Sequence, residues 1–242
     1  MKKRIELGLF ALVLMACVAV GPAQAQDTGK VSILVGYSYQ LNNLGNDLMA
    51  PNLCVFSSNC VPTELGQQGY SFAATYNFNK NIGLEANFTG HNGGANVFSF
   101  PASSANNGDL ERQTQDLYTY TFGPKVTLPV GNFSLFSHFL VGGMHSHIGD
   151  TETCIPSTGG GATCSSTVLF SANANGSGMA FKTGGGLDWN HGRWGIRILE
   201  VDYVHGAVSI TGTCSSCFGT PDTIPTWANN FQLATGLTFN FK

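Results

Sequence analysis

The stretch from Tyr70 to Thr89, YSFAATYNFNKNIGLEANFT, decides the fold. Apolar or aromatic residues occupy every second position on both sides of a short polar segment, residues 79–81. A period of two is typical of a β-strand with one apolar face, because successive side chains point to opposite sides. Two such strands joined by a few polar residues predict an antiparallel hairpin.

The same alternation recurs along the chain and predicts eight strands of about ten residues or more. Six of them have a clear apolar face, in segments that begin near residues 31, 70, 82, 118, 179 and 231. Residues 133–147 are apolar at odd and even positions alike, so the sequence does not assign their inner and outer faces. Residues 194–211 place Arg197, Glu200 and Asp202 on one face only if the strand is interrupted, so we predict a β-bulge near Leu199.

The connections between these strands alternate in length. Short turns are predicted at residues 79–81, 129–132 and 190–193. Long connections rich in Gly, Ser, Asn and Pro are predicted at residues 41–68, 92–113, 148–177 and 212–226. This alternation is typical of outer-membrane barrels, which have tight periplasmic turns and long external loops.

The composition excludes several classes of protein. With 43% apolar and 11% aromatic residues, the chain is too hydrophobic for a disordered protein. With a net charge of −3 and a pI of about 6.0, the chain lacks the basic surface that a nucleic-acid-binding protein needs. Only 10% of residues are charged, which suits strands whose bulky face contacts lipid while the small polar face fills a closed barrel.

Seven charged residues fall on the small polar faces of the predicted strands. An interior of eight strands has room only for side chains, so we expect these groups to pair as a plug inside the barrel. A proton or ion path is the alternative. The predicted network consists of Glu85, Lys125, Lys182, Asp188, Arg197, Glu200 and Asp202.

Residues 1–25 are predicted to be a cleaved signal peptide, which leaves residues 26–242 as one barrel domain. A basic start, an apolar stretch over residues 7–20 and the small-x-small sequence Ala23-Gln24-Ala25 fit a secretory signal. Lipid attachment at Cys17 is the alternative form of processing.

The remaining six cysteines form three closely spaced pairs, each within one long connection. In an exported chain, such pairs indicate disulfides. Fifteen pairings of six cysteines are possible, and we expect the local one because each pair shares a connection. The expected disulfides are Cys54–Cys60, Cys154–Cys164 and Cys214–Cys217.

We predict no catalytic residue, no cofactor and no metal site. His145 and His147 share a face of their strand and could bind a metal with a third histidine such as His138, but no recognised ligand spacing is present. His145 and Ser146 cannot form a base–nucleophile pair, because neighbouring residues of a strand point to opposite faces.

Four segments carry a resemblance to a known family. They are Tyr76–Glu85 (YNFNKNIGLE), Gly184–Trp189 (GGGLDW), Arg197–Tyr203 (RILEVDY) and Leu237–Phe241 (LTFNF). With these segments in this order, the mature chain resembles the eight-stranded outer-membrane protein barrels of the A and X type. The resemblance implies an all-β, antiparallel, up-and-down transmembrane barrel in the bacterial outer membrane. It also implies contact with outer-membrane lipid and recognition of the last strand by the barrel-assembly machinery, and we expect no peptidoglycan-binding domain.

These features together predict an integral outer-membrane barrel with a structural or surface-interaction role. It would present disulfide-linked external loops to a ligand that the sequence leaves unidentified. A narrow channel for ions or small solutes is one alternative, and an enzyme that modifies lipid A is another.

Overall fold

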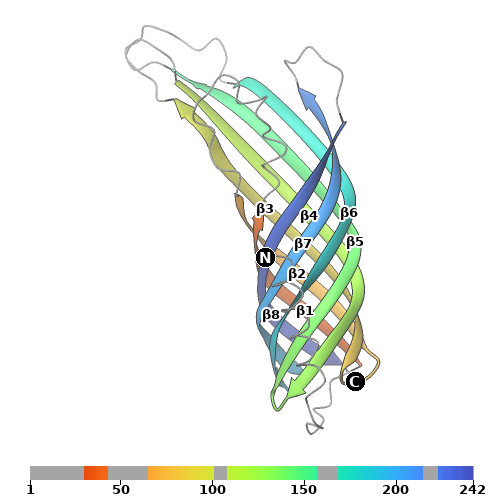
Figure 1. The fold of residues 1–242 in the computed structure, drawn as a ribbon. Coiled ribbons are helices and arrows are strands. Elements are labelled where there is room, and N and C mark those ends of the chain that lie inside the picture. The colour runs from red at the N-terminus through yellow and green to blue at the C-terminus, as the bar shows by residue number, and fades with distance from the viewer. Residues whose placement is uncertain (1–29, 43–64, 101–107, 157–167, 215–222, 242) are drawn as a thin grey trace, which may run out of the picture.

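The computed structural model describes residues 30–42, 65–100, 108–156, 168–214 and 223–241. They form eight antiparallel strands in sequential order, and β1 pairs with β8 to close a barrel, as the sequence predicts (Figure 1). No helix among these residues is long and apolar enough to span a membrane. The strands are β1 (Val31–Asn42), β2 (Leu65–Asn77), β3 (Ile82–Phe100), β4 (Gly108–Val130), β5 (Phe133–Ile155), β6 (Val168–His191), β7 (Trp194–Cys214) and β8 (Thr223–Phe241).

The barrel is apolar outside and largely polar inside. Phe72 and Phe181 are 43% and 41% exposed, whereas Thr75 and Lys182 are buried. This distribution is the reverse of that in a water-soluble barrel, in which the large apolar side chains would fill the interior. The alternation read from the sequence therefore assigned the two faces correctly.

The predicted β-bulge in β7 is confirmed. The register between β7 and β8 shifts between Arg197 and Glu200, and the consecutive residues Ile198 and Leu199 both lie on the outside. Because two successive residues point outward, the residues beyond the bulge alternate in the opposite phase. As a result, Arg197, Glu200 and Asp202 all point into the barrel.

The faces of β5, which the sequence left unassigned, are settled by the structure. Phe136, Leu140 and Met144 are buried inside, while Phe139 and Val141 are exposed outside. Part of the lumen is thus itself apolar. This is why the strand is apolar on both parities.

The short turns lie together at one end of the barrel, called the turn end below (Figure 1). Gly131 and Gly192 have φ values of 60° and 65°, which suits the first loop residue of a two-residue hairpin turn. At the remaining turn, the Asn79 carboxamide oxygen accepts hydrogen bonds of 2.8 Å from the backbone N–H groups of Asn81 and Ile82. Glycine conformation therefore shapes two of the turns, and a side-chain hydrogen bond shapes the third.

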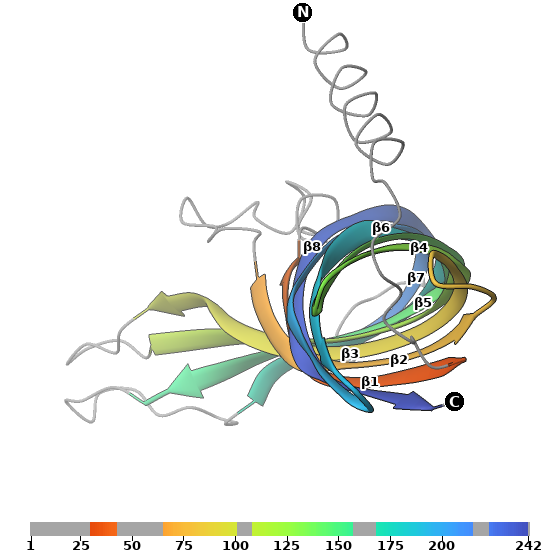
Figure 2. The same cartoon turned by 90° about the horizontal axis from the view of Figure 1, so that it is seen from below.

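The predicted bounds of the long connections are wrong, most of all for residues 92–113 and 148–177, where strands occupy much of the predicted connection. Strands β3 to β6 run for 19 to 24 residues and project beyond the closed barrel (Figures 1 and 2). Backbone pairing continues through Gly-, Ser- and Asn-rich sequence because ladder hydrogen bonds do not need large side chains. Of the predicted connections, only residues 43–64, 101–107, 157–167 and 215–222 lie outside the described residues.

Candidate functional site

All seven predicted charged residues lie inside the barrel and are buried. Ion pairs join them in two sets, Lys125 with Glu85 and the remaining five with one another, and His138 connects the two sets. Together with His138, they are called the charge cluster below. Its members are Glu85, Lys125, His138, Lys182, Asp188, Arg197, Glu200 and Asp202.

Arg197 lies at the turn end of the charge cluster. Its Nε is 2.8 Å from Asp188 Oδ1 and its Nη2 is 3.2 Å from Oδ2, which is the paired geometry that suits a guanidinium and a carboxylate. The Nη1 group pairs with Glu200, which stands three residues further along β7 beyond the bulge. The bulge therefore brings both charges to one side of the strand.

Lys182 lies among three oxygen-bearing side chains. Its Nζ is 2.7 Å from Asp202 Oδ2 and 3.5 Å from Glu200 Oε1. It also donates a hydrogen bond of 3.2 Å to Asn87 Oδ1. The ammonium group is fully buried, so these partners replace the water it would otherwise bind.

Lys125 and Glu85 form the third part of the cluster, on β4 and β3. Their charged atoms are 2.8 Å apart, and the Thr75 hydroxyl donates a further hydrogen bond of 3.1 Å to Glu85 Oε2. Both oxygens of Glu85 are thus engaged, since Oε1 faces His138.

His138 was missed by the sequence prediction, although it bridges two parts of the cluster. Its Nδ1 is 3.0 Å from Glu85 Oε1 and its Nε2 is 2.9 Å from Asp202 Oδ1. A signal for it was present. Because only two residues separate β4 from β5, pairing outward from this turn places His138 opposite the predicted lumen residue Lys125.

The geometry around His138 suits an imidazolium ring, because both ring nitrogens face carboxylate oxygens that can only accept. We therefore expect both nitrogens to carry protons at neutral pH, which balances four carboxylates with four cations. Nitrogen-15 NMR of labelled protein should show two protonated ring nitrogens for His138. A resonance at the position of an unprotonated nitrogen would contradict this balance.

An aromatic ring at the centre of the lumen also contacts the cluster. Phe136 is buried, and the cationic groups of Lys125 and Arg197 lie 4.4 Å and 4.1 Å from its ring centre. Cations at this distance from an aromatic face are attracted to it. Phe136 therefore helps to fix two cations that belong to different strands.

Glycine makes room for the cluster on β6. A Cβ atom at Gly184 would overlap the Asp202 carboxylate and the neighbouring backbone of β7. A Cβ atom at Gly186 would likewise overlap the Phe136 ring, so close packing inside the barrel explains both lumen-facing glycines of the run Gly184-Gly185-Gly186.

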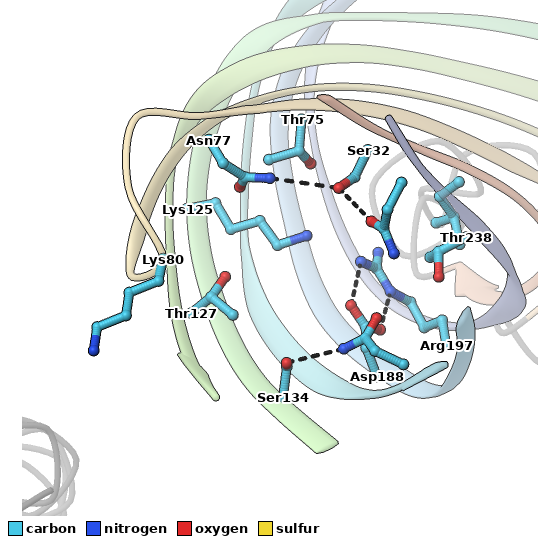
Figure 3. Close-up of a pocket in the computed structure, with 13 residues that line it drawn as sticks. Ser32, Thr75, Asn77, Lys80, Lys125, Thr127, Ser134, Asp188, Arg197 and Thr238 are labelled. Atoms are coloured by element: carbon cyan, nitrogen blue, oxygen red, sulfur yellow. Dashed lines mark hydrogen bonds and ion pairs between the residues drawn. The ribbon is translucent and has the colours of Figure 1, made fainter. Parts of the chain in front are cut away.

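A polar pocket opens on the turn-end side of the cluster (Figure 3). Lys125, Asp188 and Arg197 line it, and it is bounded by short polar residues such as Ser32 and Ser134. Figure 3 shows Asp188 bonded to Arg197 and Lys80 directed away at the neighbouring turn. Lys125 and Arg197 are therefore already paired within the cluster.

Apolar side chains from β4 to β8 pack together inside the lumen on the other side of the cluster, toward the ends of the strands with long connections. This group, called the apolar plug below, is fully buried. Each member from β4 to β7 lies further from the turn end than the cluster residue of its own strand. The plug consists of Leu117, Met144, Ala180, Val204, Val208 and Ala228.

One group of potential metal ligands occurs among the described residues. Ligand atoms of His138, Glu200 and Asp202 lie within 4.8 Å of one another. The Lys182 ammonium already contacts both carboxylates of this group. The donor set therefore fits a lysine cation better than a metal ion.

The structure does not bring together the histidines of the alternative metal site. His145 and His147 lie on the outer face of β5, where they form hydrogen bonds of 2.8 Å with Ser177 and 2.6 Å with Asn175. His138, by contrast, points into the lumen.

The adjacent residues His145 and Ser146 point to opposite faces, as expected. Ser146 is buried in the lumen, where its hydroxyl accepts a hydrogen bond of 3.4 Å from Gln115. The two side chains therefore do not meet as a base and a nucleophile.

Only two of the six paired cysteines belong to the described residues. Cys154 near the end of β5 is disulfide-bonded, and Cys214 ends β7. The residues predicted as their partners, and the whole pair Cys54–Cys60, lie outside the described residues. The three pairings therefore stay predictions, as does the signal peptide over residues 1–25.

Comparison with known proteins agrees with this architecture. The family described as outer membrane protein beta-barrel domain matches residues 10–239. No curated protein matches the chain.

Several solved structures are similar. The attachment invasion locus protein Ail of Yersinia pestis is 16% identical, with coverage of 88% of this chain and 99% of that chain and a TM-score of 0.46. The outer membrane protein OprG of Pseudomonas aeruginosa is 11% identical, with coverage of 91% and 99% and a TM-score of 0.46. Neisserial surface protein A is 8% identical, with coverage of 89% and 100% and a TM-score of 0.36.

The family match spans nearly the whole chain, and the barrel that it describes is the one observed, with an apolar exterior and a polar, charge-filled interior. The chain therefore belongs to the outer membrane protein beta-barrel domain family and is a β-barrel protein of the bacterial outer membrane.

Proposed function

We propose that this protein is a non-conducting barrel that holds an extended external sheet and its loops at the cell surface, in a structural or surface-interaction role. The observation that carries this proposal is the double closure of the lumen. The charge cluster fills one level and the apolar plug fills the next.

The two levels oppose the passage of ions in different ways. At the cluster, every cation has a carboxylate partner within the barrel wall, so a moving ion would have to break existing pairs. At the plug, Leu117 and Met144 are fully buried, so an ion that passes beside them would lose part of its hydration against apolar side chains. An eight-stranded barrel has little spare width for a path around them.

The external sheet is the part of the barrel available for interaction. A tilted strand needs about 9 to 11 residues to cross a bilayer. Strands β4 and β5 each have 23 residues and β6 has 24, so roughly half of each strand extends beyond the hydrocarbon. Disulfides at Cys154–Cys164 and Cys214–Cys217 would hold the connections at the tip of this sheet, if the predicted pairings form.

A narrow channel is the second candidate, and one observation favours it. Gln232, Gln40 and Gln67 are buried side by side on β8, β1 and β2. Within the described part of the chain, the carboxamides of Gln40 and Gln232 have no hydrogen-bond partner. Buried polar groups of this kind are usually satisfied, and water along this wall would satisfy them.

Recordings in planar bilayers separate the two candidates. We expect the inserted wild-type protein to give no unitary conductance above that of the bare membrane, because both levels stay closed. Heat-modifiable mobility on a gel would confirm that the same sample is folded. Reproducible conductance steps in folded wild-type protein would support the channel and reject the plugged barrel.

We also propose that the protein is not an enzyme, because His145 and Ser146, the adjacent pair considered for hydrolase chemistry, lie on opposite faces of β5. Mass analysis of lipid A from cells with and without the protein should give the same acylation pattern. A change in acylation that requires the folded barrel would contradict this proposal.

A further inference from the structure

We infer that the turn end of the barrel carries a binding site for a glycerophospholipid of the periplasmic leaflet, with the phosphate on Arg193 and an acyl chain against the aromatic side chains beside it. The site is a pocket of about 390 Å³ lined by Arg193, Trp194, Phe239, Asn240 and Phe241. It lies outside the charge cluster, and the inference does not depend on whether the lumen conducts.

The apolar wall of the pocket comes from two neighbouring strands. Trp194 on β7 is paired with Phe239 on β8, and their ring centres are 4.5 Å apart. Trp194 and Phe241 are 58% and 51% exposed on the outer surface. In a membrane protein this surface faces lipid, so its natural contact is an acyl chain near the interface.

The polar end of the pocket is Arg193, in the turn between β6 and β7. The backbone oxygen of Arg193 accepts a hydrogen bond of 2.8 Å from the Asn240 N–H, and the positive φ of Gly192 shapes the same turn. The backbone position of Arg193 is therefore fixed against β8. Its side chain is exposed and forms no ion pair with any described carboxylate.

The surroundings of this site favour a negatively charged ligand. Lys30 and Lys80 are also exposed at the turn end. The one carboxylate that lines the nearby lumen pocket, Asp188, is already bonded to Arg197. An arginine without a partner suits a phosphate group, because a guanidinium can donate two parallel hydrogen bonds to two of the phosphate oxygens.

The combination of a guanidinium with exposed rings selects a lipid over a free anion. Inorganic phosphate would contact Arg193 but would make no contact with the exposed rings of Trp194 and Phe241. An uncharged or zwitterionic lipid would fill the apolar wall with a weaker attraction to the arginine. A lipid with a net negative headgroup, such as phosphatidylglycerol, satisfies both parts of the pocket.

Quenching of tryptophan fluorescence by brominated lipids tests the site directly. In the variant W189F/W227F, Trp194 is the sole reporter. The folded full-length protein is placed in phosphatidylcholine vesicles that contain brominated phosphatidylglycerol or brominated phosphatidylcholine. One cation near a membrane surface should favour the anionic lipid by about fivefold in relative binding constant.

Two further variants of this reporter serve as test and control. R193Q should lower the preference for phosphatidylglycerol to about one, while R112Q should leave it unchanged, because Arg112 lies on the far projection of β4. Equal quenching by both lipids in the reporter, or an unchanged preference in R193Q, would overturn the inference. Loss of the preference on addition of inorganic phosphate at constant ionic strength would also overturn it, because the site would then bind the free anion.

Discussion

Replacement of Arg197 with methionine should lower the free energy of unfolding by about 3–5 kcal/mol, which is the usual cost of removing one partner from a buried ion pair. Methionine has no donor for Asp188 or Glu200, both of which are bonded to Arg197 inside the barrel. The change also removes the contact between the guanidinium and the Phe136 ring. Asp188 would then be left without an ion pair, and Glu200 would keep only Lys182, in a site with little access to water.

Urea unfolding in phospholipid vesicles, followed by tryptophan fluorescence, measures this loss. Lys80→Met is the matched control, because it removes an exposed cation at the same end of the barrel and should change stability by no more than about 0.5 kcal/mol. Equal losses in the two variants would show that the cluster does not stabilise the fold.

A second substitution separates the effect of charge from that of packing. In the double variant R197M/E200Q, one carboxylate is removed together with the guanidinium, so the remaining cations and carboxylates of the cluster again balance. We expect part of the lost stability to return. If the double variant is no more stable than R197M, the loss comes from the unpaired Asp188 carboxylate or from packing around Phe136.

Introduction of arginine on the lipid-facing surface should cost about 2–4 kcal/mol if the site lies near the middle of the bilayer. Leu237 suits this test, because it is 48% exposed and stands between the exposed residues Val35 and Ile196 of the neighbouring strands. The Leu237→Arg variant would place a guanidinium against acyl chains, far from any carboxylate of the cluster. Refolding into vesicles followed by urea titration measures the effect.

Thr114→Arg is the control for this second prediction. Thr114 is exposed on the part of β4 that projects beyond the barrel, where an arginine meets water. Its stability should stay within about 0.5 kcal/mol of the wild type. A similar loss at both positions would contradict the assignment of the Leu237 surface to lipid.

The fold was largely predictable because period-two alternation reports directly on which face meets lipid. Phe72 and Phe181 are outside, and Thr75 is inside, as their parity indicates. The bulge near Leu199 was predictable for a different reason, since a regular strand would have placed a carboxylate against lipid. The length of β3 to β6 was not predictable. Their outer parts pair through backbone hydrogen bonds, and the side chains there do not alternate between apolar and polar.

The charged residues of the site were predictable because each stands on the small polar face of its strand. Their partners were not, since pairing depends on the stagger between strands that are distant in sequence. His138 and Phe136 were missed because β5 is apolar on both faces, so alternation could not tell inside from outside. Pairing across the tight turn at Gly131 is the one local rule that links His138 to Lys125.

The composition of the charge cluster has a consequence for insertion into the membrane. Its eight groups come from β3, β4, β5, β6 and β7. The β3–β4 pair is neutral by itself, with Glu85 and Lys125, whereas β6 and β7 together carry two cations and three carboxylates and need His138 of β5 for balance. A sheet that contains β6 and β7 without β5 would expose one unmatched carboxylate to hydrocarbon, which is unfavourable. Neutralisation of the charges on β6 and β7 is thus coupled to the arrival of β5 beside them during assembly in the bilayer.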